Sequence, residues 1–204
     1  NLPPAPTQAV AHGWQKFENE ADTDFALPHN AAWGQAIIER WQARCGDHAT
    51  QIPLVIGGEA LLEGRVIGEC RDPSRPGVVV GRYRQATNDD VARAVECAAA
   101  DPDGWRALSP AQRYDVLGKV AQELRLARGD LMGAALADGG KTLMESDPEV
   151  SEAIDFLEFY RATARWWQEM PTLQARPKGV VVVVPPWNFP IAIPCGGVAA
   201  ALAA

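Results

Sequence analysis

Residues 181–190 read VVVVPPWNFP, an apolar run that stops at two prolines and is followed by a single amide side chain, Asn188. A β-branched run without polar alternation is typical of a parallel strand that is covered on both faces. We therefore predict a strand over Val180–Val184 and a helix that starts near Ile191. Together they are expected to form the first half of a β–α–β unit in an α/β fold.

Asn188 lies where the predicted strand crosses to the helix. In α/β proteins, the carboxyl ends of parallel strands line the crevice that binds ligands. An amide side chain donates a hydrogen bond without carrying charge, which suits it to stabilise a negative oxygen in a transition state. An Asn in this place can equally well cap the following helix. The spacing alone leaves both interpretations open.

Four helices are predicted upstream of this motif. The apolar residues Trp33, Ile37, Ile38 and Trp41 recur at helical spacing and indicate a helix over 31–43. Polar helix starts follow at 87–90 (TNDD), 109–112 (SPAQ) and 146–149 (SDPE), and the last of these helices is expected to reach about residue 170.

Packing and strands are predicted from the same patterns. Val91 and Val95 are expected to begin a buried stripe, and Trp166 and Trp167 to pack in the core. The short β-branched segments 52–61 and 77–86, divided by Gly and Pro, predict strands with turns. The first 30 residues are rich in Pro, Asp, Glu and Asn, a composition that predicts an irregular lead-in.

The composition excludes several classes of function. The chain has 204 residues, 47% of them apolar, and a net charge of −7 without a basic run, so a nucleic-acid or anionic-membrane surface is disfavoured. Its four cysteines lie at least 25 residues apart without a CxxC motif, which argues against a zinc site and a disulfide framework and favours a cytoplasmic protein. The three histidines lack neighbours at ligand spacing, so no metal site is predicted. Chemistry on a small molecule is the class of function that remains.

The stretch DGGKT at 138–142 superficially resembles a phosphate-binding loop. That loop requires a glycine where Ala135 stands, and a helical pattern precedes it instead of a strand. We predict the end of a helix, with Gly139 or Gly140 as its left-handed cap and Lys141 facing the negative end of the helix dipole.

Several segments together resemble the aldehyde dehydrogenase superfamily. They are PWNFP at 186–190, the small-residue helix 196–204, GKT at 140–142 and EVSEAIDFLEFY at 149–160. Within the superfamily the pattern is most similar to the L-glutamate γ-semialdehyde (Δ1-pyrroline-5-carboxylate) dehydrogenase branch. The stretch FENEADTDFALPHNAAW at 17–33 resembles the segment that joins the two enzyme modules of bifunctional proline utilization A proteins.

The resemblance implies NAD-dependent oxidation of an aldehyde to a carboxylate. In such enzymes a cysteine thiolate attacks the aldehyde, an asparagine holds the oxyanion and hydride passes to NAD. The matching positions are Asn188 for the oxyanion, the backbone of Val184, Pro185, Pro186 and Trp187 for the nicotinamide ribose, Phe189 for an aromatic wall, and Glu152 for the substrate amino group. Glu152 could instead be an ordinary acid that favours the start of its helix.

The resemblance also implies how the chain is organised. Residues 1–50 would be the lead-in and first helix, 51–179 the amino-terminal strands and helices of the module, and 180–204 the start of a Rossmann-like NAD-binding region. The double proline at Pro185 departs from the pattern. Cys195 is not expected to be the nucleophile, because in the family that cysteine lies far downstream of the asparagine.

The resemblance further implies that this chain is the amino-terminal part of a larger, homo-oligomeric enzyme. This part would contain only the beginning of the nucleotide-binding sheet. A fused proline dehydrogenase domain is possible, and FAD is expected only if that domain precedes residue 1. The chain alone is expected to be inactive. Two rival interpretations stay open, namely another semialdehyde dehydrogenase, such as one for succinate semialdehyde, and a non-catalytic scaffold domain of this fold.

Overall fold

The computed structural model describes residues 17–204, which form a mixed α/β structure. Its helices are α1 (Pro28–Ala43), α2 (Asn88–Ala100), α3 (Pro110–Gly139), α4 (Leu143–Gln168) and α5 (Ala192–Ala203). Short 3-10 turns occur at η2 (Gly46–His48) and η3 (Trp105–Ala107). The strands are β1 (Thr50–Ile52), β2 (Leu54–Ile56), β3 (Glu59–Leu61), β4 (Ile67–Arg71) and β5 (Val79–Arg84). None of the described helices combines the length and the apolar character needed to cross a membrane.

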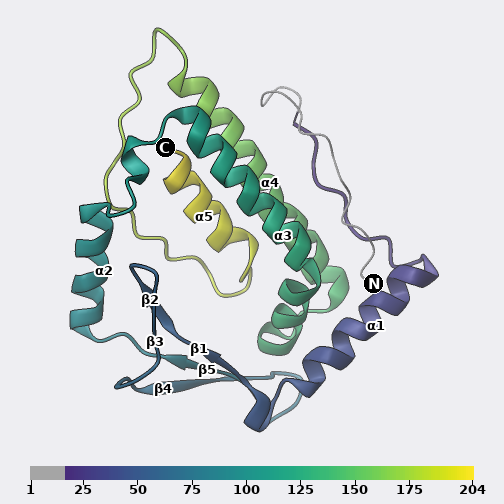
Figure 1. Cartoon of the computed structure of the whole chain (residues 1–204). Helices are drawn as coiled ribbons and strands as arrows, with labels where there is room; N and C mark the ends of the chain where they lie inside the picture. Colours follow the sequence, from purple (N-terminus) through teal and green to yellow (C-terminus); the bar gives the residue numbers. More distant parts are fainter. Residues whose placement is uncertain (1–16) are drawn as a thin grey trace.

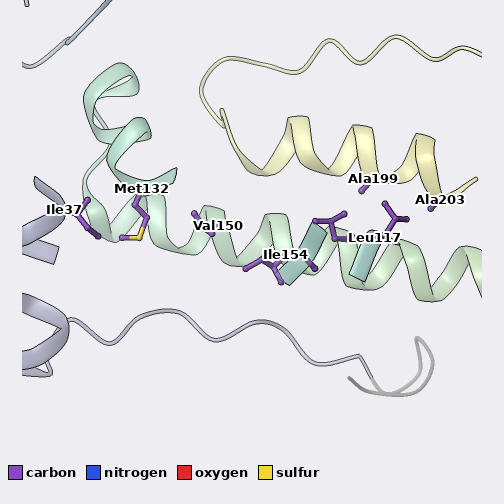
Figure 2. Close-up of a cluster of buried hydrophobic side chains, with 9 residues drawn as sticks. Ile37, Leu117, Met132, Val150, Ile154, Ala199 and Ala203 are labelled. Atoms are coloured by element: carbon purple, nitrogen blue, oxygen red, sulfur yellow. The ribbon is translucent and has the colours of Figure 1, made fainter. Parts of the chain in front are cut away.

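The long helices α3 and α4 lie side by side, and α5 packs beside both of them (Figure 1). Buried apolar side chains fill the space between these helices and α1, in a row that Figure 2 shows along α4. This core comprises Ile37, Leu117, Ala121, Met132, Val150, Ile154, Leu157, Ala199 and Ala203. The small residues of α5 allow its backbone to pack closely against α4, where Gly196 lies against the Phe156 ring.

Two small sheets lie near one end of the helices (Figure 1). In the first, β5 is the middle strand, paired in parallel with β1 and antiparallel with β4, where the register shifts between Cys70 and Arg71. In the second, β2 and β3 form a hairpin through Gly57 and Gly58, which have φ angles of 59° and 80°. These positive φ angles explain the glycine pair.

Local sequence signals placed most helix ends correctly. Thr87 caps α2 in a capping box with Asp90, and Ser109 caps α3 in a capping box with Gln112. The C-cap of α3 is Gly140, whose φ of 67° is the left-handed conformation expected at this position. The helix predicted over 31–43 is confirmed as α1, which begins three residues earlier.

The predicted start of α4 at 146–149 is wrong. α4 begins at Leu143, where Thr142 and Glu145 form the capping box, and Pro148 lies inside the helix. Asp147 does not cap a helix, because its side chain is buried and accepts hydrogen bonds from the backbone and hydroxyl of Thr23, at 2.6 and 2.8 Å.

Two predictions of buried side chains are also wrong. Val91 and Val95 are 55% and 46% exposed, because α2 meets the β2–β3 hairpin through the side that carries Cys97, whose sulfur lies against Gly57. Trp166 and Trp167 are 39% and 51% exposed. The next residue on α4, Gln168, faces the end of α5, and neighbouring helical residues point about 100° apart.

The strand predicted over Val180–Val184 does not form. The segment has no regular secondary structure, no described strand pairs with it, and most of its valines are exposed. A strand needs hydrogen bonds from a neighbour, which residues 17–204 do not supply here. Instead Val183 lies against Gly197 of α5. The helix after the motif is confirmed, since α5 starts one residue after Ile191.

Residues 17–27, the part of the lead-in that the structure describes, are irregular, as predicted, yet they are held by buried charges; residues 1–16 lie outside the described residues. Glu20 lies 2.8 Å from Arg125 and 3.7 Å from Arg128, both on α3. Arg128 also pairs with Asp147 of α4 at 2.9 Å, and Asp147 in turn accepts the Thr23 hydrogen bonds. We call these five residues the strap cluster. It ties the lead-in to α3 and α4 through charge and hydrogen bonding, in addition to the aromatic contact of Phe17 with Phe159 of α4.

Candidate functional site

Asn188 lies in the loop before α5, and its side chain is exposed. Within residues 17–204 its amide makes no hydrogen bond, and the N-cap position of α5 is Ile191 without a side-chain cap. The interpretation of Asn188 as the helix cap is therefore wrong. Its amide remains available to a ligand.

A glutamate on another helix takes the capping role. One oxygen of Glu149, Oε1, accepts hydrogen bonds from the backbone N–H groups of Ile191 at 2.6 Å and Ala192 at 3.2 Å. The Glu149 side chain is 1% exposed, and its other oxygen, Oε2, pairs with Nζ of Lys141. A carboxylate at a helix N-terminus is favoured by the free N–H groups and the helix dipole. Glu149 thereby joins α4 to the start of α5.

The ammonium group of Lys141, which we predicted to face the end of the α3 dipole, pairs with Glu149 of α4. The same ammonium lies 4.5 Å from the centroid of the Phe189 ring, in cation–π geometry. Only the backbone N–H of Lys141 bonds the last turn of α3, at the carbonyl of Ala135. Lys141 thus contacts both the capping glutamate and the residue that follows Asn188.

The other expected site residues lie around this loop. Phe189, which follows Asn188, is 44% exposed. Val184 and Trp187, which precede Asn188, are 85% and 86% exposed. Glu152 is exposed on α4, three residues after Glu149, and makes no hydrogen bond or ion pair within the described residues. Residues three apart on a helix share a face, so Glu152 lies on the side of α4 that carries the cap.

Cys195 has the features of a structural thiol. Its Sγ donates to the carbonyl of Ala153 at 3.5 Å, and burial raises the pKa of the thiol from 9.0 to about 11. A raised pKa keeps the thiol protonated and unreactive at neutral pH. This agrees with the expectation that Cys195 is not the nucleophile.

The segment 184–187 fits a cofactor contact through its backbone. Residues 184–186 have no regular secondary structure and Trp187 begins a turn; Pro185 and Pro186 carry no N–H, and no hydrogen bond to the carbonyl groups of 184–187 is formed within the described residues. Exposed carbonyl groups of this kind can accept hydrogen bonds from ribose hydroxyls. Residues 17–204 contain no cluster of His, Cys, Asp or Glu able to hold a metal ion, and His12 lies outside them.

Sequence reasoning missed the roles of Glu149 and Lys141. A signal was present, because Glu149 lies beside Val150 and four residues before Ala153, both in the buried stripe of α4. A carboxylate in a buried stripe needs a partner. The sequence did not reveal which partner, because Lys141 and the start of α5 approach it only in the folded chain.

Comparison with known proteins gives a consistent result. Residues 63–204 match the model of the aldehyde dehydrogenase family. Among curated proteins, the bifunctional protein PutA of Escherichia coli is 32% identical over 98% of this chain and 14% of its own length. A 1-pyrroline-5-carboxylate dehydrogenase of Geobacillus thermodenitrificans is 31% identical over 92% of this chain and 38% of its own length.

Solved structures agree with these sequence relatives. Proline utilization A from Bdellovibrio bacteriovorus superimposes with a TM-score of 0.84 at 28% identity, over 92% of this chain and 20% of that protein. A 1-pyrroline-5-carboxylate dehydrogenase from Thermus with bound NAD gives the same TM-score at 27% identity, over 92% of this chain and 38% of that protein. The chain therefore spans well under half the length of the proteins it matches.

Proposed function

Because the chain belongs to the aldehyde dehydrogenase family, we propose that the protein containing it oxidises L-glutamate γ-semialdehyde to glutamate with NAD, in proline catabolism. The sequence relatives and solved structures named above support this choice within the family, since they are 1-pyrroline-5-carboxylate dehydrogenases and PutA proteins. The wider fold is α/β, as expected.

The observation that carries the proposal is the unused amide of Asn188. The start of α5 is capped by Glu149, so Asn188 has no structural bond within residues 17–204 that explains it. In the proposed reaction its amide N–H donates to the oxygen of the aldehyde as that oxygen becomes negative. A neutral donor placed in advance lowers the energy of this transition state without competing for the proton.

Two further residues are proposed to select the substrate. Phe189 supplies an apolar wall beside the aldehyde chain, and it is held by Lys141 on one side of its ring. Glu152 presents an exposed carboxylate on the same side of α4 as Glu149, where it can pair with the ammonium group of glutamate semialdehyde. A simple aldehyde without an amino group would not gain this contact.

The backbone of Val184, Pro185, Pro186 and Trp187 is proposed to hold the nicotinamide ribose through its free carbonyl groups. When bound, NAD supplies the acceptor for the hydride. The attacking thiolate is not Cys195, whose pKa is raised by burial. A fused proline dehydrogenase domain, with its FAD, and a homo-oligomeric assembly belong to the same proposal for the whole protein.

Steady-state kinetics of the full-length protein test this proposal. NADH formation is measured with L-glutamate γ-semialdehyde, succinate semialdehyde and propanal as substrates. We expect the highest kcat/KM for glutamate semialdehyde. A higher value for succinate semialdehyde would assign the protein to that substrate instead, and no NADH from any of the three would indicate a non-catalytic scaffold.

A further inference from the structure

We infer that Lys141 and Glu149 are positioning residues, which hold the loop around Asn188 in place for the proposed oxidation. This inference rests on the proposed function. Neither residue needs to touch the substrate, and each acts through the backbone or the ring of a residue next to Asn188. Lys141 belongs to the GKT stretch at 140–142, which has no role in the proposed chemistry itself.

Glu149 fixes the carboxyl-terminal side of the loop. It bonds the N–H groups of Ile191 and Ala192, whereas α5 has no side-chain cap of its own. Pro190 precedes these donors and lacks an N–H. Within residues 17–204, Glu149 is thus the acceptor for the first two donors of α5, and it sets how far this end of the loop lies from α4.

Lys141 fixes the middle of the loop. Its ammonium group lies over the Phe189 ring and pairs with the Glu149 carboxylate. One cation therefore contacts both a residue of the loop and the capping glutamate, and we call the Lys141 and Glu149 contacts with the loop the tethers. The lysine side chain is only 17% exposed, which strengthens both interactions relative to a surface pair. Its own backbone is fixed by the left-handed turn at Gly140 and the bond to α3.

These tethers matter because Asn188 has none. Its exposed amide is unbonded within the described residues, so its direction depends on the backbone on either side. An oxyanion donor acts only within about 2.7–3.1 Å of the developing charge. A displacement of about 1 Å can cost roughly 100-fold in rate. Loss of the Lys141 cation is therefore expected to lower turnover although the residue is not catalytic.

The test compares Lys141→Met and Lys141→Arg in the full-length protein. We expect Lys141→Met to lower kcat by roughly 10- to 100-fold with a much smaller change in KM, because the lost interaction serves the transition state. Lys141→Arg keeps the cation and is expected to recover most of the lost kcat. Lys119→Met on the exposed face of α3 is the matched control, with wild-type kinetics expected.

Lys141→Met leaves the buried Glu149 carboxylate without its partner, so folding is tested separately. The double variant Lys141→Met, Glu149→Gln removes both charges but keeps a carbonyl acceptor for α5. It is expected to fold and to show the same loss of kcat, because the Phe189 ring has lost its cation.

A second measurement does not depend on activity. Hydrogen exchange of the peptide that contains Ile191 and Ala192 is expected to be roughly tenfold faster in Lys141→Met and unchanged in Lys119→Met. Wild-type kcat and wild-type exchange in Lys141→Met would overturn the inference, as would a Lys141→Arg rate as low as that of Lys141→Met. If the wild-type protein oxidises no aldehyde, the proposed function fails, and the exchange experiment still decides whether the tethers hold the loop.

Discussion

Replacing Arg128 with methionine removes the central cation of the strap cluster. Arg128 lies 2.9 Å from the Asp147 carboxylate, donates to the Ser151 hydroxyl at 3.1 Å and lies 3.7 Å from Glu20. The side chains of Asp147 and Glu20 are each 1% exposed, so water does not replace the lost partner. The change removes a donor from the buried Asp147 carboxylate and a nearby positive charge from the buried Glu20 carboxylate, while keeping an unbranched apolar stem.

The expected cost follows from what each carboxylate retains. Breaking a buried ion pair by removing one partner costs about 3–5 kcal/mol. Asp147 keeps both hydrogen bonds from Thr23, and Glu20 keeps Arg125, so the cost lies near the lower value. About 3 kcal/mol corresponds to a roughly 100-fold change in an equilibrium constant. We therefore expect amides of the lead-in, including that of Thr23, to exchange roughly 100-fold faster if local opening controls them.

Hydrogen exchange with mass spectrometry on the full-length protein measures this effect. The matched control is Arg40→Met, which breaks the surface pair of Arg40 with Asp130 at 3.0 Å, where the two side chains are 40% and 52% exposed. Exposed pairs contribute about 0–1 kcal/mol, so little change is expected. If Arg128→Met exchanges at the rate of Arg40→Met, the lead-in is not held by the buried charges, and the reasoning is refuted.

Two further predictions concern the candidate site. Glu152→Gln is expected to lower kcat/KM for glutamate semialdehyde by roughly tenfold and to spare propanal, because only the first substrate carries an ammonium group; equal losses would show that Glu152 merely supports α4. Cys195 is expected to react with iodoacetamide about 100-fold more slowly than a thiol of ordinary pKa 9.0 at neutral pH, since burial raises its pKa to about 11 and the thiolate appears only as the pH rises toward that value. Labelling of Cys195 at the rate of a small-molecule thiol, measured by mass spectrometry across a pH series, would contradict its burial.

Structure that depends on neighbouring residues was largely predictable from the sequence. The capping boxes of Thr87 and Ser109 lie within four residues, and so does the left-handed Gly140 turn. The start of α4 was misplaced because SDPE and TLME both have the form of a helix start. The helix starts at TLME, which places Asp147 one turn inside α4, where it pairs with Arg128.

Structure that depends on distant residues was not predictable. The strand over Val180–Val184 requires a hydrogen-bonding neighbour, which no pattern within the segment supplies. The cap on α5 comes from Glu149, more than 40 residues earlier, so the spacing near Asn188 could not show that Asn188 is not the cap. Asn188 and Phe189 were proposed as site residues from the family motif, while the contacts of Lys141 and Glu149 with this loop required the folded chain.

The most direct test of the central claim is the single-turnover rate of NADH formation in Asn188→Ala, measured on the folded full-length protein with glutamate semialdehyde. Because the structure gives Asn188 no capping role, the variant is expected to keep the wild-type melting temperature. Loss of one oxyanion donor is expected to lower the rate by roughly 10²–10³. A wild-type rate in the folded variant would contradict the assignment of Asn188 as the oxyanion donor.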